Sequence, residues 1–437
     1  MSERRLVPLS EVADVSGGYA FKSKDYVPNG HFVLRTLNIS DQGRIDKSNA
    51  VFLAEEDVPK YPKFSLREFD TVFVMVGATL GKTGLITSTD LPALLNQNMW
   101  RIRAKTNKCD PRFLYYCFLV NKNKIEGFAS GSARSFLRRN DCREMLVEVP
   151  SFADQKAIAH ILGTLDDKIE LNQKMNQTLE EIAKAIFKSW FVDFDPVRAK
   201  AEGRPTGLPP EISDLFPDEL VDSEIGEIPK GWKISKLSEV FDIQGGSQPP
   251  AKTFIDEEKD GYVRLLQIRD YDNSNHKTYI PAKKNLRLVD EDDVLIGRYG
   301  SGNGKFMEDS LGRPLRGLSG AINVAVVRTI PKLENSREFI ATMVSSGLFY
   351  KWIVGGSARA VQAGFKKDDL DYIKLSVPSP EILLVYEEFG ALVWRRTKAF
   401  REENRILSDL RDTLLPKLIS GELRIPDAEK FLEEAGI

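Results

Sequence analysis

Cysteine and histidine are scarce in this 437-residue sequence, which contains three of each. Three cysteines cannot build a disulfide framework, and neither residue type recurs at the spacing of metal ligands. No plausible Ser-His-Asp set and no acidic cluster of a metal-dependent nuclease can be found. We therefore expect no catalytic residue and no metal site. The residues concerned are Cys109, Cys117 and Cys142, which we interpret as core or incidental, and the scattered His31, His160 and His276.

Long hydrophobic runs are also absent. No run of about 18 apolar residues, the length that crosses a membrane, occurs in the chain. The first five residues do not lead into an apolar signal segment. We expect a cytoplasmic, soluble protein without a membrane partner. With 42% hydrophobic residues, a chain of this length can bury more than one core, so two or three domains are expected.

The sequence has no large excess of either charge, since its net charge is −2. The balance differs between segments, however. Residues 1–150 contain 22 basic and 17 acidic side chains, and residues 231–380 contain 22 and 19. Residues 192–230 contain only 4 basic against 10 acidic ones. An anionic partner that contacts only the two basic segments is permitted by this distribution, though not demanded.

Two enzyme motifs are missing or incomplete. The flipped-base motif of an adenine methyltransferase needs an acidic or Asn residue, two prolines and an aromatic in series, and neither double proline, in 208–211 or in 248–251, fits it. The loops 77–83 and 300–305 each combine glycines with a lysine, but only three residues separate the glycines, whereas a nucleotide-binding P-loop needs four. ATP binding is not expected. These loops suit either a DNA phosphate or a tight turn.

The longest stretch that one secondary structure could hold is 151–194, which we predict to be a single helix. Ser151 and Asp154 resemble a capping box at its start. The heptad pattern predicts a coiled-coil helix that needs a partner, with Asn172 either fixing the register or facing solvent. One row of the predicted seam holds Ile158, Leu165, Asn172, Leu179 and Ile186, and the other holds Ile161, Lys168, Met175, Ile182 and Ser189.

An internal duplication organises the chain. At an offset of 228, residues 9–18 match residues 237–246 at seven of ten positions, and Val149-Pro150-Ser151 matches Val377-Pro378-Ser379. Near offset 225, residues 131–134 match residues 356–359. The same shift places a second long helix at about 381–418. We predict α+β globules at 1–150 and 231–380, with mostly antiparallel sheets.

The rest of the predicted architecture follows from this repeat. The two similar globules are separated by a pair of long antiparallel coiled-coil helices and related by a pseudo-twofold axis. The predicted segments besides the globules are a helix at 151–195, an extended, acidic, proline-rich linker at 196–230, a second helix at 381–423 and a C-terminal tail at 424–437. Predicted strands include 71–76, 99–102, 293–296 and 322–327, and predicted helices include 111–121 and 336–347.

Several loops carry side chains that could contact DNA. Asn and Gln can pair with adenine and Arg with guanine, while small basic loops can approach phosphates. A solvated basic surface is the alternative. The candidate DNA-binding residues are Tyr19, Lys22, Lys24, Arg35, Thr79, Lys82, Asn96, Gln97, Arg134 and Arg138 in the first globule, and Gln248, Arg269, Arg298, Tyr299, Ser301, Asn303, Lys305, Arg359 and Lys366 in the second.

Three motifs resemble the specificity subunit of Type I restriction-modification systems. They are Ser189-Trp190-Phe191-Val192-Asp193-Phe194-Asp195-Pro196-Val197, Gly226-Glu227-Ile228-Pro229-Lys230-Gly231-Trp232 and Leu415-Pro416-Lys417-Leu418-Ile419-Ser420-Gly421-Glu422-Leu423. The resemblance covers essentially the whole chain, duplication included. It implies that the globules are target-recognition domains, each reading one half of a split, asymmetric double-stranded DNA site. One departure is that the second helix begins Pro378-Ser379-Pro380-Glu381, without the glutamine found at Gln155.

The resemblance also implies partners and cofactors. Two methyltransferase subunits would dock on the long helices and methylate adenine, and restriction subunits would cleave distant DNA. This chain would have no cofactor, since S-adenosylmethionine, ATP and Mg would belong to the partner subunits. Two other functions remain open from the residues alone: a coiled-coil scaffold without DNA binding, and a self-sufficient methyltransferase, which the missing motif disfavours.

Overall fold

The computed structural model describes residues 4–40, 43–77, 79–121, 138–271, 277–300, 306–307, 309–356, 363–434 and 436. The chain divides into two compact units. The first combines Met1–Leu171 with Glu403–Ile437, and the second is Asn172–Glu402. Candidate DNA-binding residues Arg134, Ser301, Asn303, Lys305 and Arg359 lie outside the described residues.

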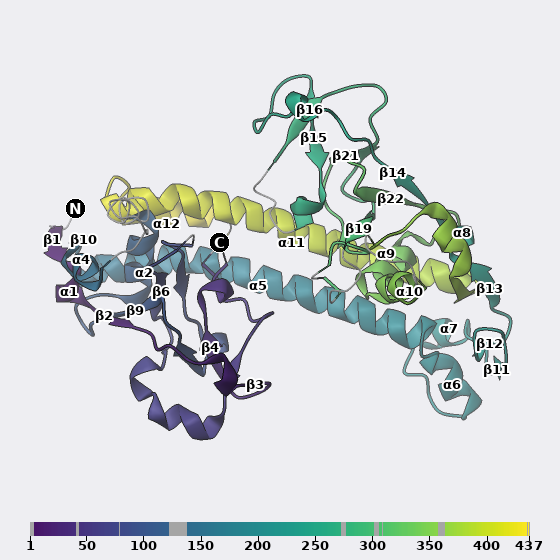
Figure 1. The fold of residues 1–437 in the computed structure, drawn as a ribbon, viewed down its shortest axis with the longest axis horizontal. Coiled ribbons are helices and arrows are strands. Elements are labelled where there is room, and N and C mark those ends of the chain that lie inside the picture. The colour runs from purple at the N-terminus through teal and green to yellow at the C-terminus, as the bar shows by residue number, and fades with distance from the viewer. Residues whose placement is uncertain are drawn as a thin grey trace. The chain divides into compact units, whose positions relative to one another are not determined.

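Two long helices contribute to both units (Figure 1). Helix α5 covers Phe152–Phe191 and α11 covers Pro380–Ser420. The predicted cap is confirmed, because the backbone N–H of Asp154 donates to Ser151 Oγ at 3.1 Å. Helix α11 begins at a proline, which needs no hydrogen-bond acceptor in the first turn. Both predicted long helices are therefore present.

The missing glutamine is replaced by an apolar contact. The buried Gln155 side chain of α5 donates to Pro150 O at 3.0 Å and accepts from the N–H of Asp110 at 2.9 Å. At the matching position of α11, 228 residues further along, stands Leu383, which is 4% exposed. A hydrophobic side chain in the core of the second unit thus occupies the place of the hydrogen-bonded amide, and the helix still forms.

Within each unit the helices run antiparallel. In the first unit Arg411 contacts Asp166 at 2.7 Å, and Glu403 contacts Lys168 at 3.4 Å. In the second unit Arg401 contacts Glu180 at 3.5 Å, and the Tyr386 hydroxyl donates to Ala183 O at 3.2 Å. Residue numbers rise along α5 as they fall along α11. The predicted antiparallel pairing is confirmed inside each unit.

Only one row of the predicted seam is right. Its members Ile158, Leu165 and Asn172 are buried, and Leu179 and Ile186 are half-buried. The other row is right only at its start, since Ile161 is 1% exposed but Met175 and Ile182 are 42% and 44% exposed. A helix of 3.6 residues per turn drifts against a strict heptad, and the second row falls one residue further along the chain. The buried members of this second row are Leu162, Ile169, Ala183 and Trp190.

The globule of the first unit contains two four-stranded sheets. In the first sheet all neighbours are antiparallel, and in the second only β4 and β8 pair in parallel. The spatial order is β2 (Ala13–Gly17), β9 (Met99–Ala104), β6 (Thr71–Val74), β7 (Thr83–Leu85) in one and β3 (Tyr26–Val27), β5 (Phe52–Leu53), β4 (His31–Leu34), β8 (Ala93–Leu95) in the other. A separate pair joins β1 (Arg5–Pro8) to β10 (Leu146–Val149).

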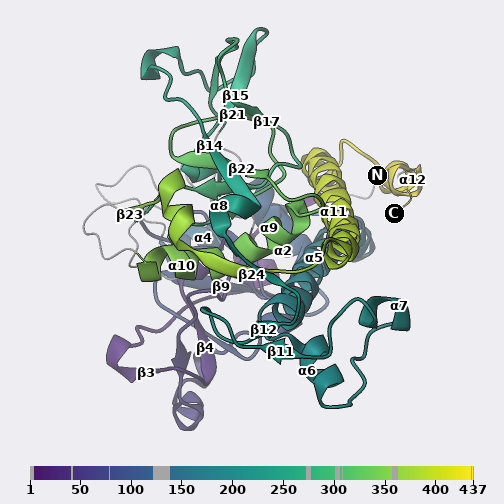
Figure 2. The ribbon, with the colours of Figure 1, turned by 90° about the vertical axis from the view of Figure 1, so that its right-hand side faces the viewer.

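The globule of the second unit (Figure 2) also contains two four-stranded sheets and a separate pair. The strand order of the first sheet is repeated, whereas the fourth strand of the other sheet lies beside the parallel pair and not beside its antiparallel neighbour. One sheet is again wholly antiparallel, and the other contains one parallel pair, β15 with β21. The strands are β14 (Phe241–Gly245), β22 (Val326–Pro331), β18 (Leu295–Gly297), β20 (Pro314–Leu315), then β16 (Tyr279–Pro281), β15 (Tyr262–Leu266), β21 (Gly320–Ile322), β17 (Leu288–Val289), and the pair β13 (Lys233–Lys236) and β24 (Lys374–Val377). The duplication read from the sequence is therefore a duplication of fold.

Helices cover each globule and link its sheets to the long helices. The prediction of helices near 111–121 and 336–347 is confirmed by α2 (Pro111–Val120) and α9 (Arg337–Ser345). The predicted strand 322–327 is wrong. It is broken at Asn323, whose side chain accepts from the N–H of Ala325 at 3.0 Å, so that β21 ends and β22 begins after a turn.

The sequence predicts an extended linker over 196–230, and this prediction is also wrong. The segment folds into the helices α6 (Asp195–Ala201) and α7 (Pro210–Ser213) and the hairpin β11 (Leu220–Val221) and β12 (Ile228–Pro229). Val197 and Phe216 are buried in the core of the second unit, and Phe216 lies 5.2 Å from the ring of Trp190. A few buried apolar residues are enough to fold this segment. The high content of proline and acidic residues around them led to the prediction of an extended linker.

The predicted C-terminal tail contains a helix, α12 (Ile425–Glu434), whose Ala428 and Leu432 join the core of the first unit. The N-terminus lies beside the end of α11. Arg4 donates through its guanidinium to the carbonyl oxygens of Leu418 and Ile419, which are among the last of that helix and have no partner within it. Both chain ends thus belong to the first unit.

Candidate nucleic-acid interface

A Gly-Gly pair follows β2 in the first globule and β14 in the second. A Cβ atom on Gly18 would lie 1.9 Å from Asn96 O, and one on Gly246 would lie 1.8 Å from Ile322 O. Both obstacles are backbone atoms, so only glycine fits. The next residue is held in the same way in each globule, because Tyr19 N–H donates to Leu95 O at 3.0 Å and Ser247 N–H donates to Ile322 O at 3.2 Å.

In the first globule this turn brings three predicted residues together. The Gln97 N–H donates to Tyr19 O at 2.9 Å and to Asn96 Oδ1 at 2.7 Å, and Asn96 Nδ2 donates to the hydroxyl of Tyr26 at 3.3 Å. Asn96 is buried while the Gln97 side chain is exposed. We therefore assign Asn96 to holding the loop and Gln97 to presenting an amide to a partner.

The basic candidates of the first globule differ in whether their side chains are hydrogen-bonded within the protein. Lys22, Lys24 and Arg138 are exposed and free to meet a phosphate. Arg35 instead donates to Asn49 O, and Lys82 Nζ lies 3.4 Å from Ile39 O.

The glycine loop between β6 and β7 is a tight turn. The Gly81 N–H donates to Val74 O at 3.0 Å, and the Lys82 N–H donates to Thr79 O at 3.1 Å. Thr79 is half-buried at this turn. The sequence left open whether this loop is a tight turn or a site for a DNA phosphate, and its backbone forms a tight turn.

In the second globule the five described candidates are exposed or half-buried. Tyr299 lies in the short strand β19 (Tyr299–Gly300), and the others lie outside the strands. Gln248 and Lys366 are exposed, and Tyr299 is 43% exposed. The Arg298 guanidinium lies 5.3 Å from the centroid of the Tyr299 ring, and its Nε donates to Phe365 O at 3.2 Å. Arg269 is exposed as well, and its guanidinium donates to Thr278 Oγ1 at 2.5 Å.

In the first globule, two aromatic residues that lie beside Tyr19 were missed by the sequence analysis. The rings of Tyr61 and Phe64 lie 4.8 and 5.2 Å from the ring of Tyr19, although they are far from it along the chain. Partial burial raises the pKa of the Tyr61 hydroxyl. No local pattern marks these residues. Two successive 3₁₀ helices, Glu55–Lys60 and Pro62–Phe64, are joined at Tyr61 and bring both rings to Tyr19.

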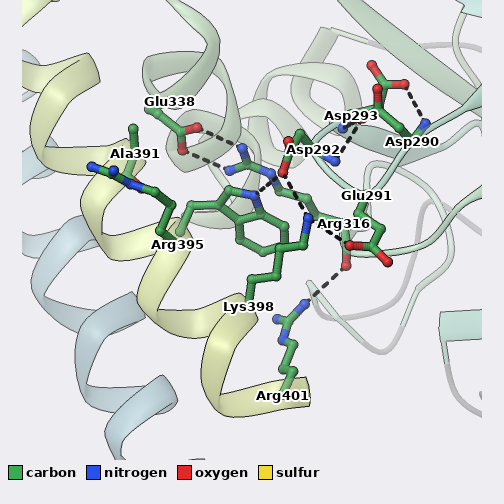
Figure 3. Close-up of polar contacts among 11 residues, drawn as sticks. Asp290, Glu291, Asp292, Asp293, Arg316, Glu338, Ala391, Arg395, Lys398 and Arg401 are labelled. Carbon is green, nitrogen blue, oxygen red and sulfur yellow. Dashed lines mark hydrogen bonds and ion pairs between the residues drawn. The ribbon is translucent and has the colours of Figure 1, made fainter. Parts of the chain in front are cut away.

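A polar cluster attaches the second globule to α11 (Figure 3). Trp394 Nε1 donates to Asp292 Oδ1 at 2.7 Å, and the Arg316 guanidinium lies over the Trp394 ring at 4.0 Å. Arg316 also forms a bidentate pair with Glu338 at 2.8 and 2.7 Å. Asp292 lies three residues before β18, which leads to Arg298 and Tyr299, so this cluster holds the start of the segment that carries these two candidates.

The cysteines are core residues, as expected. Burial raises the pKa of Cys109 and of Cys142 to about 12, so these thiols stay protonated at neutral pH. Among the described residues, no group of three or more His, Cys, Asp or Glu side chains could hold a metal ion. None of the helices in the described part of the chain is both long and apolar enough to span a membrane.

Comparison with known proteins identifies relatives over most of the chain. A family model described as the Type I restriction modification DNA specificity domain matches residues 1–181 and 229–383. The Type I restriction enzyme HindI specificity subunit of Haemophilus influenzae is 25% identical over 432 residues, covering 84% of this chain and 89% of that protein. The MjaIX specificity subunit of Methanocaldococcus jannaschii is 24% identical, covering 83% and 80%.

A solved structure shares the fold. The S subunit of a Type I restriction-modification system from M. genitalium superposes with a TM-score of 0.55 at 15% identity, covering 95% of this chain and 96% of that one.

Proposed function

The chain belongs to the Type I restriction-modification DNA specificity family, and on this basis we propose that its two globules each read one half of a bipartite, asymmetric DNA site. Recognition of DNA sequence within a restriction-modification complex is the role that this family carries. The observation behind the proposal is the repeated Gly-Gly turn. In both globules the second glycine is crowded by backbone and the next N–H donates to a strand carbonyl, but the next residue is Tyr19 in one and Ser247 in the other.

Equivalent frames with different side chains suit two different half-sites. The exposed Lys22, Lys24 and Arg138 suit phosphate contacts, and the exposed Gln97 and Gln248 suit base edges. The scaffold alternative gains no support, because a scaffold without DNA binding would give no reason for the family match.

The chemistry is proposed to lie on partner subunits. The chain would act without catalytic residues of its own, directing adenine methylation and DNA cleavage by methyltransferase and restriction subunits. S-adenosylmethionine, ATP and Mg would bind to those partners. The double-stranded DNA site would be the ligand of this chain.

Exchange of one globule tests the two-half-site proposal. If residues 1–150 are replaced by those of a relative with another specificity, one half of the methylated site should change while the other half stays the same. Mapping methylated adenines in cells that carry the exchange gives the answer. The matched control replaces residues 231–380 and should change only the other half. A change in both halves from either exchange would contradict the assignment of one globule to one half-site.

A methyltransferase subunit is proposed to dock on the exposed apolar side of α5 in the second unit. Met175 and Ile182 are 42% and 44% exposed, and seven residues of separation place them on one side of the helix. Replacing both with Asp should lower the amount of methyltransferase subunit that copurifies with the chain at least about 10-fold, because a charge would be buried unpaired. Gln173→Asp, at another exposed position of α5, is the control. Undiminished copurification of the double variant would refute this docking site.

A further inference from the structure

Tyr19 stands on a platform of three aromatic rings at the surface of the first globule. Its ring centroid lies 5.0 Å from that of Phe21, 4.8 Å from that of Tyr61 and 5.2 Å from that of Phe64. Phe21 is buried, whereas the Tyr19 residue remains 39% exposed. Such offset contacts stabilise the rings against one another. The exposed part of Tyr19 is therefore held in place by its neighbours.

The backbone of Tyr19 is fixed as firmly as its ring. The N–H donates to Leu95 O at 3.0 Å, and the carbonyl accepts from the N–H of Gln97 at 2.9 Å and from that of Phe21 at 3.1 Å. The backbone of Gly18 lies so close to that of Asn96 that a Cβ atom on Gly18 would be 1.9 Å from Asn96 O, so the turn is closely packed. A rigid aromatic side chain loses little conformational entropy when it binds a partner.

The charges around the platform allow DNA to approach. Lys22 and Lys24, which follow Tyr19, and Lys63, between the two other surface rings, are all exposed. Of the nearby acidic side chains, Asp57 pairs with Lys60 Nζ at 2.5 Å and Glu55 lies 3.0 Å from His31 Nδ1, while Asp25 and Glu56 are exposed. An aromatic surface flanked by lysines is typical of sites where bases stack and phosphates are neutralised.

The internal repeat provides a comparison within the same chain. Ser247 occupies the position of Tyr19 in the second globule, where its N–H donates to Ile322 O as that of Tyr19 donates to Leu95 O. Serine has no ring to stack. The two globules thus share the turn but differ in the side chain that the turn presents.

We propose that Tyr19 is a stacking wedge that unstacks one base step of the half-site read by the first globule, an inference that rests on the proposed function above. Aromatic and apolar side chains inserted at a base step kink and partly unstack the duplex. Pyrimidine–purine steps are the easiest to deform, so the wedge selects a TA or CA/TG step at its position without hydrogen bonds to those bases. The second globule reads its half-site without unstacking.

The test first identifies the site and then measures stacking on it. The full-length chain, without partner subunits, selects duplexes from a random DNA pool, and the enriched sequence gives both half-sites. Permanganate oxidation of unstacked thymines and 2-aminopurine fluorescence are then measured along this duplex. The wild-type chain is expected to unstack a single step, in one half-site only. Absence of specific enrichment would contradict the proposed function, whereas enrichment without an unstacked step would contradict only the wedge.

Variants assign the unstacking to Tyr19. Tyr19→Ser, which carries the residue that the second globule accepts at the same turn, should abolish the unstacked step and weaken binding about 10-fold, equivalent to roughly 1.4 kcal/mol of lost stacking. Tyr19→Phe should keep both properties. Ser247→Ala should leave the unstacked step unchanged. Unaltered selection of the second half-site by Tyr19→Ser shows that this variant is folded, and unstacking that persists in it would overturn the proposal.

Discussion

Replacing Arg316 with alanine is expected to lower the free energy of unfolding of the second unit by about 3–5 kcal/mol. The Arg316 and Glu338 side chains are only 13% and 7% exposed, and two hydrogen bonds join them. Without Arg316 the Glu338 carboxylate stays buried and loses its partner. Stacking of the guanidinium on Trp394 would be lost as well (Figure 3).

Urea unfolding followed by tryptophan fluorescence measures this loss. The matched control removes both charges, as Arg316→Met with Glu338→Leu. Because replacing a buried pair by apolar residues is often neutral, the double variant should be much closer to the wild type than the single one. Equal losses in the single and double variants would show that packing, and not the unpaired carboxylate, sets the effect.

Gly18→Ala is expected to destabilise the first globule by about 2–3 kcal/mol and to disrupt its recognition turn. The added Cβ would meet Asn96 O at 1.9 Å, and a backbone oxygen cannot move aside as a flexible side chain can. The strain would displace Tyr19 and Gln97, which are hydrogen-bonded at this turn. Specificity for one half-site should therefore fall even where the chain remains folded.

The neighbouring Gly17→Ala is the control for this variant. A Cβ at Gly17 would have no atom within 4 Å, so this change should leave both stability and site selection nearly unaltered. Thermal unfolding of both variants and selection from a random DNA pool distinguish the two outcomes. Similar behaviour of Gly17→Ala and Gly18→Ala would show that the crowding at Gly18 does not matter.

Repetition and periodicity were the most informative parts of the sequence. The match between residues 9–18 and 237–246 identified a duplicated fold, and the side chain of Ser151 marked the start of α5. The second seam row failed because Met175 and Ile182 are apolar but exposed, and periodicity alone cannot tell a buried apolar side chain from an exposed one. The fold of 196–230 was missed because its buried apolar residues, such as Val197 and Phe216, follow no regular period in a polar segment.

The candidate interface was predicted less completely than the fold. The residue types of Tyr19 and Gln97 suggested DNA contacts, and the structure brings them together. The burial of Asn96 and the approach of Tyr61 depend on contacts between distant segments, for which a single sequence gives no local signal. The chemical character of the candidate side chains could therefore be predicted from the sequence, whereas their burial and their neighbours in space could not.

The first unit is built from both ends of the chain, since it combines Met1–Leu171 with Glu403–Ile437. Its core contains Leu407, Leu414 and Leu418 of α11 beside Ile158 and Leu162 of α5. Because a ribosome makes the chain from the N-terminus, this core cannot close until the final segment has been synthesised. A nascent or prematurely terminated chain that ends before Glu403 would expose the apolar side of α5 in this unit, which makes it a substrate for chaperones and proteases.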